Sequence, residues 1–247
     1  MAVRRLRFLA GDRQHRDTRL FHTKDYATRK LYDTPAYGVA FYHQSTIDDL
    51  LTRGLSLTFG IRYDYEHTSN DFLFYKETDG GSEQMDAFDS RLKFSQVTPK
   101  IALQYMFPST GMLYATVTKG YKTGGFNTSF DREEDRTFRP ETSWNYELGA
   151  KHPFLDNRLN AEFCFFWIDW KNQQIYQMLA TQNGQFLRNA GRSESKGVEV
   201  SLQGNPVNGL MVQVNYGFTH ATFKDYKDER RGIDYSCLLY TSPSPRD

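Results

Sequence analysis

The sequence predicts an all-β protein, an antiparallel up-and-down sheet whose strands are long enough to cross a membrane. Three observations predict this fold class. Apolar and polar residues alternate with a period of two, the alternating segments are 9 to 13 residues long, and the connections between them are short and long in turn. Strands of soluble proteins average about 5–6 residues, whereas a tilted strand needs about 9–11 residues to span a bilayer. We therefore expect a transmembrane β-barrel, present in part.

The alternation is clearest from Leu55 to Tyr65, where apolar or aromatic residues occupy the odd positions and polar or small residues occupy the even ones. Successive side chains of a strand point to opposite faces, so this segment has one apolar and one polar face. The pattern recurs along the chain, more weakly in the segments Tyr37–Ile47 and Met112–Tyr121. It predicts eight strands: 37–47, 55–65, 97–107, 112–121, 143–151, 158–169, 196–204 and 210–222.

The connections between these segments contain 7, 31, 4, 21, 6, 26 and 5 residues in chain order. In an up-and-down sheet alternate connections lie at the same edge, so the tight turns and the long loops should lie at opposite edges. Outer-membrane barrels have this asymmetry, with short periplasmic turns and long extracellular loops. Aromatic residues should form a girdle at the long-loop edge. They are Tyr63, Tyr65, Trp144, Tyr146, Trp167, Trp170, Tyr216 and Phe218.

Composition narrows the function classes. The chain has 31 Lys and Arg residues against 30 Asp and Glu residues, which argues against a nucleic-acid surface built on bulk positive charge. The longest apolar run, 163–168, is far shorter than the about 20 residues of a spanning helix. Two cysteines and six scattered histidines form no disulfide framework and no metal-ligand spacing. We find no Ser-His-Asp or Cys-His arrangement, and expect no enzyme, no metal site and no cofactor.

Three stretches together resemble the TonB-dependent outer-membrane receptors. Residues 114–127 (YATVTKGYKTGGFN) resemble the strand-to-loop segment of that family. Residues 139–151 (RPETSWNYELGAK) look like the strand that follows, and residues 189–199 (NAGRSESKGVE) are similar to a later Gly-Val-Glu strand. The resemblance keeps order and spacing from about residue 35 to about residue 225.

The resemblance implies a 22-stranded barrel with an N-terminal plug, a ligand bound at the extracellular loops, and uptake driven by the inner-membrane TonB complex. Eight strands would be about a third of that barrel, so we expect an open sheet without plug, TonB-contacting segment or closing strand. We assign 35–236 to the partial barrel and 1–34 to a loop or partial preceding strand. Residues 237–247 resemble a translated sequencing adapter and are set aside. We interpret the chain as a fragment.

We expect the two faces of the sheet and the loops to have different roles. We expect an apolar lipid-facing set, Leu57, Phe59, Ile61, Phe163, Phe165, Val212 and Val214. We expect a polar lumen-facing set, Arg62, Asp64, Asn145, Glu147, Glu199, Gln213 and Asn215. Arg and Lys beside aromatic residues suit an anionic, partly apolar ligand. The candidate ligand contacts are Tyr121, Lys122, Phe126, Asn127, Arg132 and Arg139 at the 21-residue loop, and Tyr176 and Arg188 in the 26-residue loop.

The expected function is active uptake of an iron–siderophore complex in the bacterial outer membrane. The expected partners are outer-membrane lipid, the TonB complex through the plug region, and the ferric siderophore or another small ligand, with no nucleic acid. Vitamin B12 and oligosaccharides stay open as cargo. A passive porin, an adhesive barrel and a soluble carbohydrate-binding β-sandwich are the alternatives. A barrel hydrolase would need a Ser-His pair that we cannot place.

Overall fold

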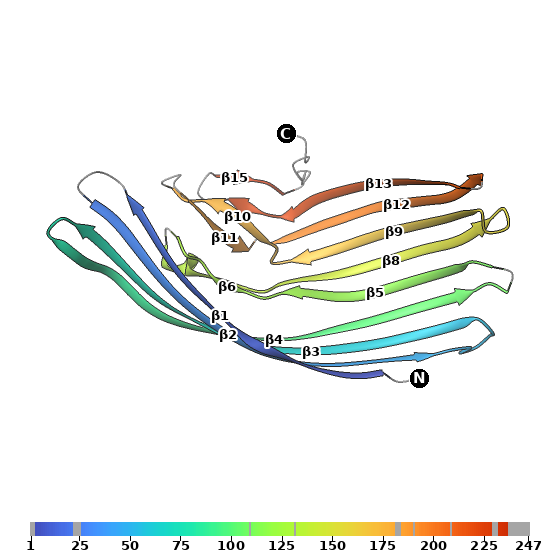
Figure 1. Cartoon of the computed structure of the whole chain (residues 1–247), viewed down its shortest axis with the longest axis horizontal. Helices are drawn as coiled ribbons and strands as arrows, with labels where there is room; N and C mark the ends of the chain where they lie inside the picture. Colours follow the sequence, from blue (N-terminus) through green and yellow to red (C-terminus); the bar gives the residue numbers. More distant parts are fainter. Residues whose placement is uncertain are drawn as a thin grey trace. The chain divides into compact units, whose positions relative to one another are not determined.

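The computed structural model describes residues 3–21, 26–108, 110–130, 132–180, 184–189, 191–207, 209–228 and 232–236. Nine strands form one sheet in the order β1-β2-β3-β4-β5-β8-β9-β12-β13, so each strand pairs with its nearest sheet strands along the chain (Figure 1). No helix in these ranges is long and apolar enough to cross a membrane. The strands are β1 (Val3–Phe21), β2 (Tyr26–Ile47), β3 (Leu55–Thr78), β4 (Gly81–Met106), β5 (Met112–Lys122), β8 (Glu141–Phe154), β9 (Leu159–Lys171), β12 (Arg192–Val207) and β13 (Leu210–Asp225).

The structure confirms the all-β, up-and-down fold, and all eight predicted strands are present. The chain also contains a ninth strand, β1, and β2 begins at Tyr26, in the region 1–34 where we expected only a loop or a partial strand. A β-sandwich, the soluble alternative, packs two sheets face to face, whereas all nine long strands of the described residues belong to one sheet.

The predicted 31-residue loop at 66–96 is wrong. Strand β3 continues to Thr78 and β4 begins at Gly81, so these residues form a long hairpin. The apolar and polar positions stop alternating after Tyr65 because the apolar face ends there, whereas the strand itself continues. Alternation of apolar and polar residues shows where the apolar face of a strand ends. In β3 and β4 the backbone pairing extends beyond that point.

The chain divides into two compact units. The second unit consists of Arg5–Tyr42 and Arg62–Val97, which are parts of β1 to β4. Its buried centre is aromatic: the Phe72 ring centroid lies 4.9 Å from that of Tyr32 and 4.7 Å from that of Phe88. Beside this cluster the Thr34 hydroxyl donates to buried Asn70 Oδ1 at 3.1 Å. These contacts hold the hairpin that the alternation missed.

The first unit, Met1–Arg4, His43–Ile61 and Thr98–Asp247, contains β5, β8, β9, β12 and β13. Its register separates two faces. Phe165 is the partner of Leu148 and Val198, and Val198 is also the partner of Phe218, which aligns apolar side chains across four strands. Six of the seven predicted lipid-facing residues are 40–55% exposed: Phe59, Ile61, Phe163, Phe165, Val212 and Val214. A continuous exposed apolar wall of this kind is suited to contact with lipid.

The girdle prediction is wrong for Trp170. The other predicted girdle residues of this unit have the parity of the apolar face: Trp144, Tyr146, Trp167, Tyr216 and Phe218. Trp167 stacks on Tyr146 with ring centroids 5.1 Å apart, and Phe218 is 54% exposed on the same face. Trp170 instead pairs with Ser143 and Ser193, on the face that also carries Ile168. Because Trp167 and Trp170 are three positions apart in one strand, they point to opposite faces.

Candidate functional site

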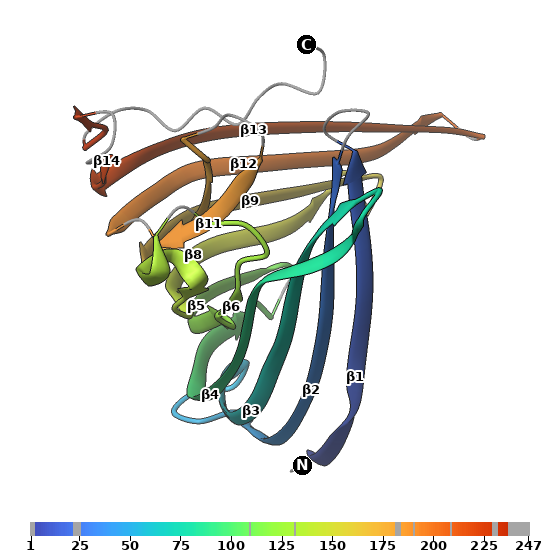
Figure 2. The same cartoon turned by 90° about the vertical axis from the view of Figure 1, so that its left-hand side faces the viewer.

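Two regions of the first unit gather polar side chains, a group of loops and the inner face of the sheet. The first loop lies between β5 and β8 and contains β6 (Gly125–Phe126), η1 (Glu133–Arg136) and β7 (Thr137–Phe138). The second lies between β9 and β12 and contains the hairpin of β10 (Gln174–Met178) and β11 (Gln185–Asn189). We call the described residues of 123–140 and 172–191 the loop platform. Figure 2 shows β6 and η1 beside the hairpin strand β11.

Asn127 joins the two loops of the platform. Its side-chain amide Nδ2 donates to the carbonyl oxygens of Asp135 and Leu187, both at 2.7 Å. Its Oδ1 accepts from the backbone N–H of Leu187 at 2.8 Å. Asn127 is only 5% exposed, so its amide serves the backbone of both loops. Among the predicted ligand contacts, Asn127 therefore has a supporting position.

Asn189 and Gln174 make a second connection between the same loops. Asn189 Oδ1 accepts from the backbone N–H of Arg139 at 2.8 Å, and its Nδ2 donates to the carbonyl of Arg139 at 2.9 Å. The backbone N–H of Gln174 donates to Glu141 Oε2 at 2.7 Å, and Gln174 Nε2 donates to the carbonyl of Thr123 at 2.7 Å. Five short hydrogen bonds thus connect loop residues that are 50 to 60 positions apart in sequence. A sixth joins the second loop to Glu141 at the start of β8.

Two of the predicted ligand contacts, Tyr176 and Arg188, lie on opposite faces of the β10–β11 hairpin. Tyr176 is 68% exposed and pairs with Leu187, on the same face as Gln174 and Asn189. Arg188 lies on the other face with Phe186, which is 1% exposed. The Arg188 Nε is 3.9 Å from a carboxylate oxygen of buried Asp135. Tyr176 is therefore available to a ligand, whereas Arg188 faces the interior of the platform.

The remaining predicted contacts lie along the first loop. Lys122 is exposed at the end of β5, and Arg139 is exposed just before β8. Arg132 is exposed and paired with Glu134, N to O 3.1 Å. Phe126 is half-buried in β6, and Tyr121 is half-buried on β5. The Gln174 and Asn189 connections thus join the backbone of Arg139, the hairpin that carries Tyr176 and Glu141, the strand partner of Lys122. Arg132 makes none of these connections.

Sequence reasoning missed Gln174 and Asn189. Both are ordinary polar residues, and Asn189 entered the sequence argument only as part of a family-like stretch. The pairing that gives them their role, Gln174 with Asn189 in the β10–β11 hairpin, covers five residue pairs and has no apolar alternation. A five-residue hairpin strand leaves too little pattern to be read without the three-dimensional register.

A third small element supports the platform from the C-terminal side. Gln177 Nε2 donates to the Tyr226 hydroxyl at 2.6 Å, and the Tyr226 ring stacks on Tyr235 with centroids 5.2 Å apart. Tyr226 and Tyr235 flank the pair β14 (Lys227–Asp228) and β15 (Ile233–Asp234). Hydrogen bonds from the Ser236 side chain and backbone lower the pKa of Asp234. This carboxylate therefore stays ionised at pH values below those at which an ordinary aspartate takes up a proton.

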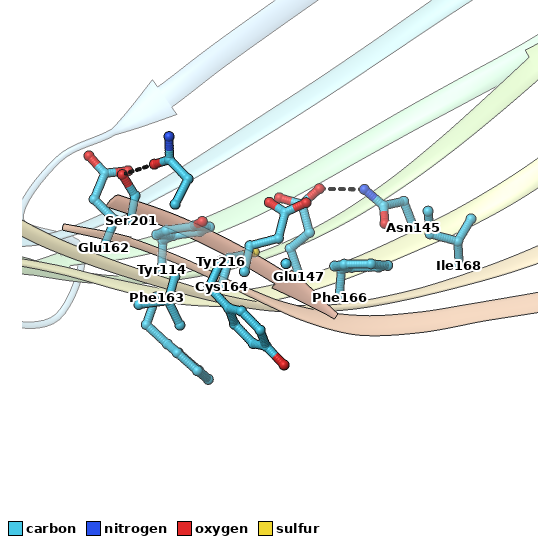
Figure 3. Close-up of a pocket in the computed structure, with 14 residues that line it drawn as sticks. Tyr114, Asn145, Glu147, Glu162, Phe163, Cys164, Phe166, Ile168, Ser201 and Tyr216 are labelled. Atoms are coloured by element: carbon cyan, nitrogen blue, oxygen red, sulfur yellow. Dashed lines mark hydrogen bonds between the residues drawn. The ribbon is translucent and has the colours of Figure 1, made fainter. Parts of the chain in front are cut away.

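The inner face carries a hollow of about 630 Å³. In Figure 3 its carboxylates, Glu147 and Glu162, point to one side of the sheet, and Phe163 and Tyr216 point to the other. Glu162 accepts a hydrogen bond from Lys151 Nζ at 2.8 Å, and Asn145 donates to Glu147. The described residues contain no group of three or more His, Cys, Asp or Glu side chains placed to hold a metal ion.

Two aromatic rings lie flat against glycines on this inner face. A Cβ added to Gly149 would be 2.3 Å from Cζ of Tyr114. A Cβ added to Gly197 would be 2.6 Å from Cζ of Phe166 and 2.1 Å from the carbonyl oxygen of Phe218. The glycines therefore make room for rings from the preceding sheet strand, a device that protects glycine within sheets. The result is a polar wall with rings closely packed against it.

The fold defines a class, a membrane β-barrel with an apolar outer wall, a polar inner wall and structured loops at one edge. The family model for TonB dependent receptor-like β-barrels matches residues 10–242, so the chain belongs to this family. The match is wider than the predicted resemblance and includes 237–242, which we set aside as adapter-like and which lie outside the described residues. Barrels of this family are transport receptors of the bacterial outer membrane, not enzymes, which confirms the predicted class and location.

Individual relatives agree with the family. The chain is 27% identical to the pesticin receptor of Yersinia pestis over 176 residues, which are 70% of this chain and 24% of that protein. It resembles the crystal structure of the ferric yersiniabactin uptake receptor of Yersinia pestis with a TM-score of 0.63 at 22% identity, over 79% of this chain and 28% of the other. It resembles the ferric-catecholate import receptor of E. coli K12 with a TM-score of 0.61 at 17% identity, over 92% and 39%. The chain spans about a quarter of the length of the curated relatives it matches.

Proposed function

We propose that the chain serves active uptake of an iron–siderophore complex, as the loop-bearing part of a TonB-dependent receptor. The relatives support this cargo class, since they include a ferric yersiniabactin uptake receptor, a ferric-catecholate import receptor and a ferripyoverdine receptor. Energy would come from the TonB complex, on which the family, by its name, depends. The cargo would bind at the loop platform.

The observation that carries the proposal is the arrangement around Gln174. Lys122 is the strand partner of Glu141, whose carboxylate holds the backbone N–H of Gln174. The Arg139 carbonyl accepts from Gln174 Nε2 at 3.3 Å, and Tyr176 lies two residues along the same hairpin face. The backbone segments that carry an exposed lysine, an exposed arginine and an exposed tyrosine are thus joined by one set of hydrogen bonds. This combination suits an anionic complex with a planar aromatic part.

Uptake of radio-iron siderophores tests the proposal in the receptor that contains this chain, expressed in cells without their own siderophore receptors. Replacing Lys122 and Arg139 together by Ala removes two charge-assisted contacts, each worth about 1.5–3 kcal/mol. We expect siderophore affinity to fall by at least about a hundred-fold. The matched control is Arg53→Ala, an exposed arginine in the turn between β2 and β3.

Three outcomes would contradict this function. Unchanged affinity in the Lys122 and Arg139 double variant would remove the loop platform as the binding site. An equal loss in Arg53→Ala would show a general charge effect. Uptake that persists when a protonophore collapses the proton gradient would replace active transport by a passive porin.

A further inference from the structure

The outer face carries a cluster of positive charges that the proposed uptake function does not use. We call Lys171, Arg192, Lys196 and Lys224 the cationic rim patch. Lys196 Nζ is 3.6 Å and Lys224 Nζ is 3.2 Å from Glu194 Oε1. Arg192 is bidentate to Asp169, with Nε to Oδ1 at 2.7 Å and Nη2 to Oδ2 at 2.9 Å. Lys171 is exposed and is the strand partner of Arg192.

The patch begins where the apolar wall ends. Along β12 the outward positions are apolar at Val200 and Val198 and then charged at Lys196, Glu194 and Arg192. Lys196 is the partner of Trp167, and the Trp167 Nε1 donates to Glu194 Oε2 at 3.1 Å. Tryptophan and tyrosine mark the level of lipid headgroups in membrane barrels. The cations therefore lie at the headgroup level, on the edge with the long loops.

The charges of the patch are arranged in two layers. The carboxylate side chains are nearly covered, Glu194 at 16% and Asp169 at 14% exposure. The cations above them are about half exposed, Arg192 and Lys196 at 52% and Lys224 at 46%. Each lysine ammonium has three donors and the guanidinium has five, so the contacts to the carboxylates leave N–H groups for a second anion. Four cations against three carboxylates, Asp169, Glu194 and the exposed Asp225 beside Arg192, leave a net positive surface toward the membrane.

We propose that the cationic rim patch binds the phosphate groups of a membrane lipid whose acyl chains lie along the apolar wall below. Phosphate is the anion that headgroups place at this depth, and Lys and Arg side chains near a membrane surface attract it. The half-buried carboxylates hold the cations in position before the lipid arrives, which lowers the ordering cost of binding. The proposal depends on the outer-membrane location and is separate from the cargo.

The test is native mass spectrometry of the whole chain released from a zwitterionic detergent, titrated with the diphosphorylated glycolipid lipid A. A lysine near a membrane surface changes lipid affinity about five-fold, so the Lys196→Gln and Lys224→Gln double variant should bind about 25-fold more weakly. The matched control is Lys151→Gln. Lys151 is 44% exposed and paired with Glu162 at 2.8 Å, but it lies on the inner face.

Glu194→Gln separates a lipid site from a plain ion-pair network. It removes a negative charge and keeps an acceptor for Trp167 Nε1, so lipid A should bind more tightly, whereas loss of a network alone would leave lipid binding unchanged or weaker. Monophosphorylated lipid A should bind more weakly than the diphosphorylated form. Wild-type affinity in the lysine double variant, an equal loss in Lys151→Gln, or displacement of the lipid by equimolar inorganic phosphate would overturn the proposal.

Discussion

At the scale of the residue, close packing on the inner face depends on glycines, whose missing side chains leave room for neighbouring atoms. Gly197 and Gly217 lie in the β12–β13 hairpin, two rungs apart on the same face. An added Cβ at Gly197 would meet the backbone oxygen of Phe218, which cannot rotate away. Among the described residues, no atom lies within 4 Å of a Cβ added to Gly217. Two glycines on the same face of one hairpin thus have different roles.

Gly197→Ala is expected to destabilise the folded chain by about 1–3 kcal/mol, because the new methyl group must displace backbone and the Phe166 ring. Gly217→Ala is the control and should be neutral or slightly stabilising, since alanine loses less backbone entropy than glycine. Urea unfolding of the chain in detergent micelles measures the free energy of unfolding of both variants. The folded fraction is read from the different mobility of folded and unfolded chain on a gel. Equal effects of the two substitutions would show that the close approach at Gly197 has no energetic weight.

At the scale of the element, the two long loops behave as one body. The side-chain amides of Asn127 and Asn189 each form hydrogen bonds with backbone groups of the other loop. Buried backbone polar groups that lose their partners cost more than the hydrogen bonds they made. The loop platform should therefore open as a unit when one connection is removed.

Asn127→Ala is expected to leave the strands folded and to loosen the platform by about 2–4 kcal/mol, since it leaves three backbone groups unpaired. Hydrogen exchange measures this locally: amides of β11 and η1 should exchange faster, and those of β8 and β9 should not change. Asn160→Ala, an exposed asparagine of β9, is the matched control. If β11 keeps its protection in Asn127→Ala, the loops are held together by other contacts.

At the scale of the whole molecule, one face of the sheet is in contact with lipid and the other faces the polar interior of the barrel. Leu148 is 58% exposed on the apolar face, and Thr116 is one rung away on the polar face, paired with Glu147. Because the two positions lie on adjacent rungs and on opposite faces, the same substitution at each compares lipid with the barrel interior.

Leu148→Arg should weaken folding into lipid vesicles by about 2–4 kcal/mol if the position lies near the bilayer midplane, because arginine is costly on the lipid face. Thr116→Arg should cost less than about 1 kcal/mol, since its new charge would lie beside Glu147. Folding yield against urea concentration in vesicles checks both. Similar losses at the two positions would contradict the assignment of the faces.

The sequence by itself determined which residues face lipid, because strand parity is a local property: alternate side chains point to opposite faces wherever the chain is extended. Phe163, Phe165, Val212 and Val214 could therefore be assigned without a structure, and Trp170 was wrong only because its parity was overlooked. The family could be recognised for a related reason, since its motifs are continuous stretches of chain.

Only the tertiary structure decided how far the strands extend and what the loop residues do. Backbone pairing continues through 66–96 without an apolar face, because packing around Phe72 replaces alternation as the stabilising force. Asn127 and Arg188 read as ligand contacts in sequence and prove to be directed into the platform. Their partners are 60 and 53 residues away, Leu187 and Asp135, and long-range register of this kind has no signature in a local pattern.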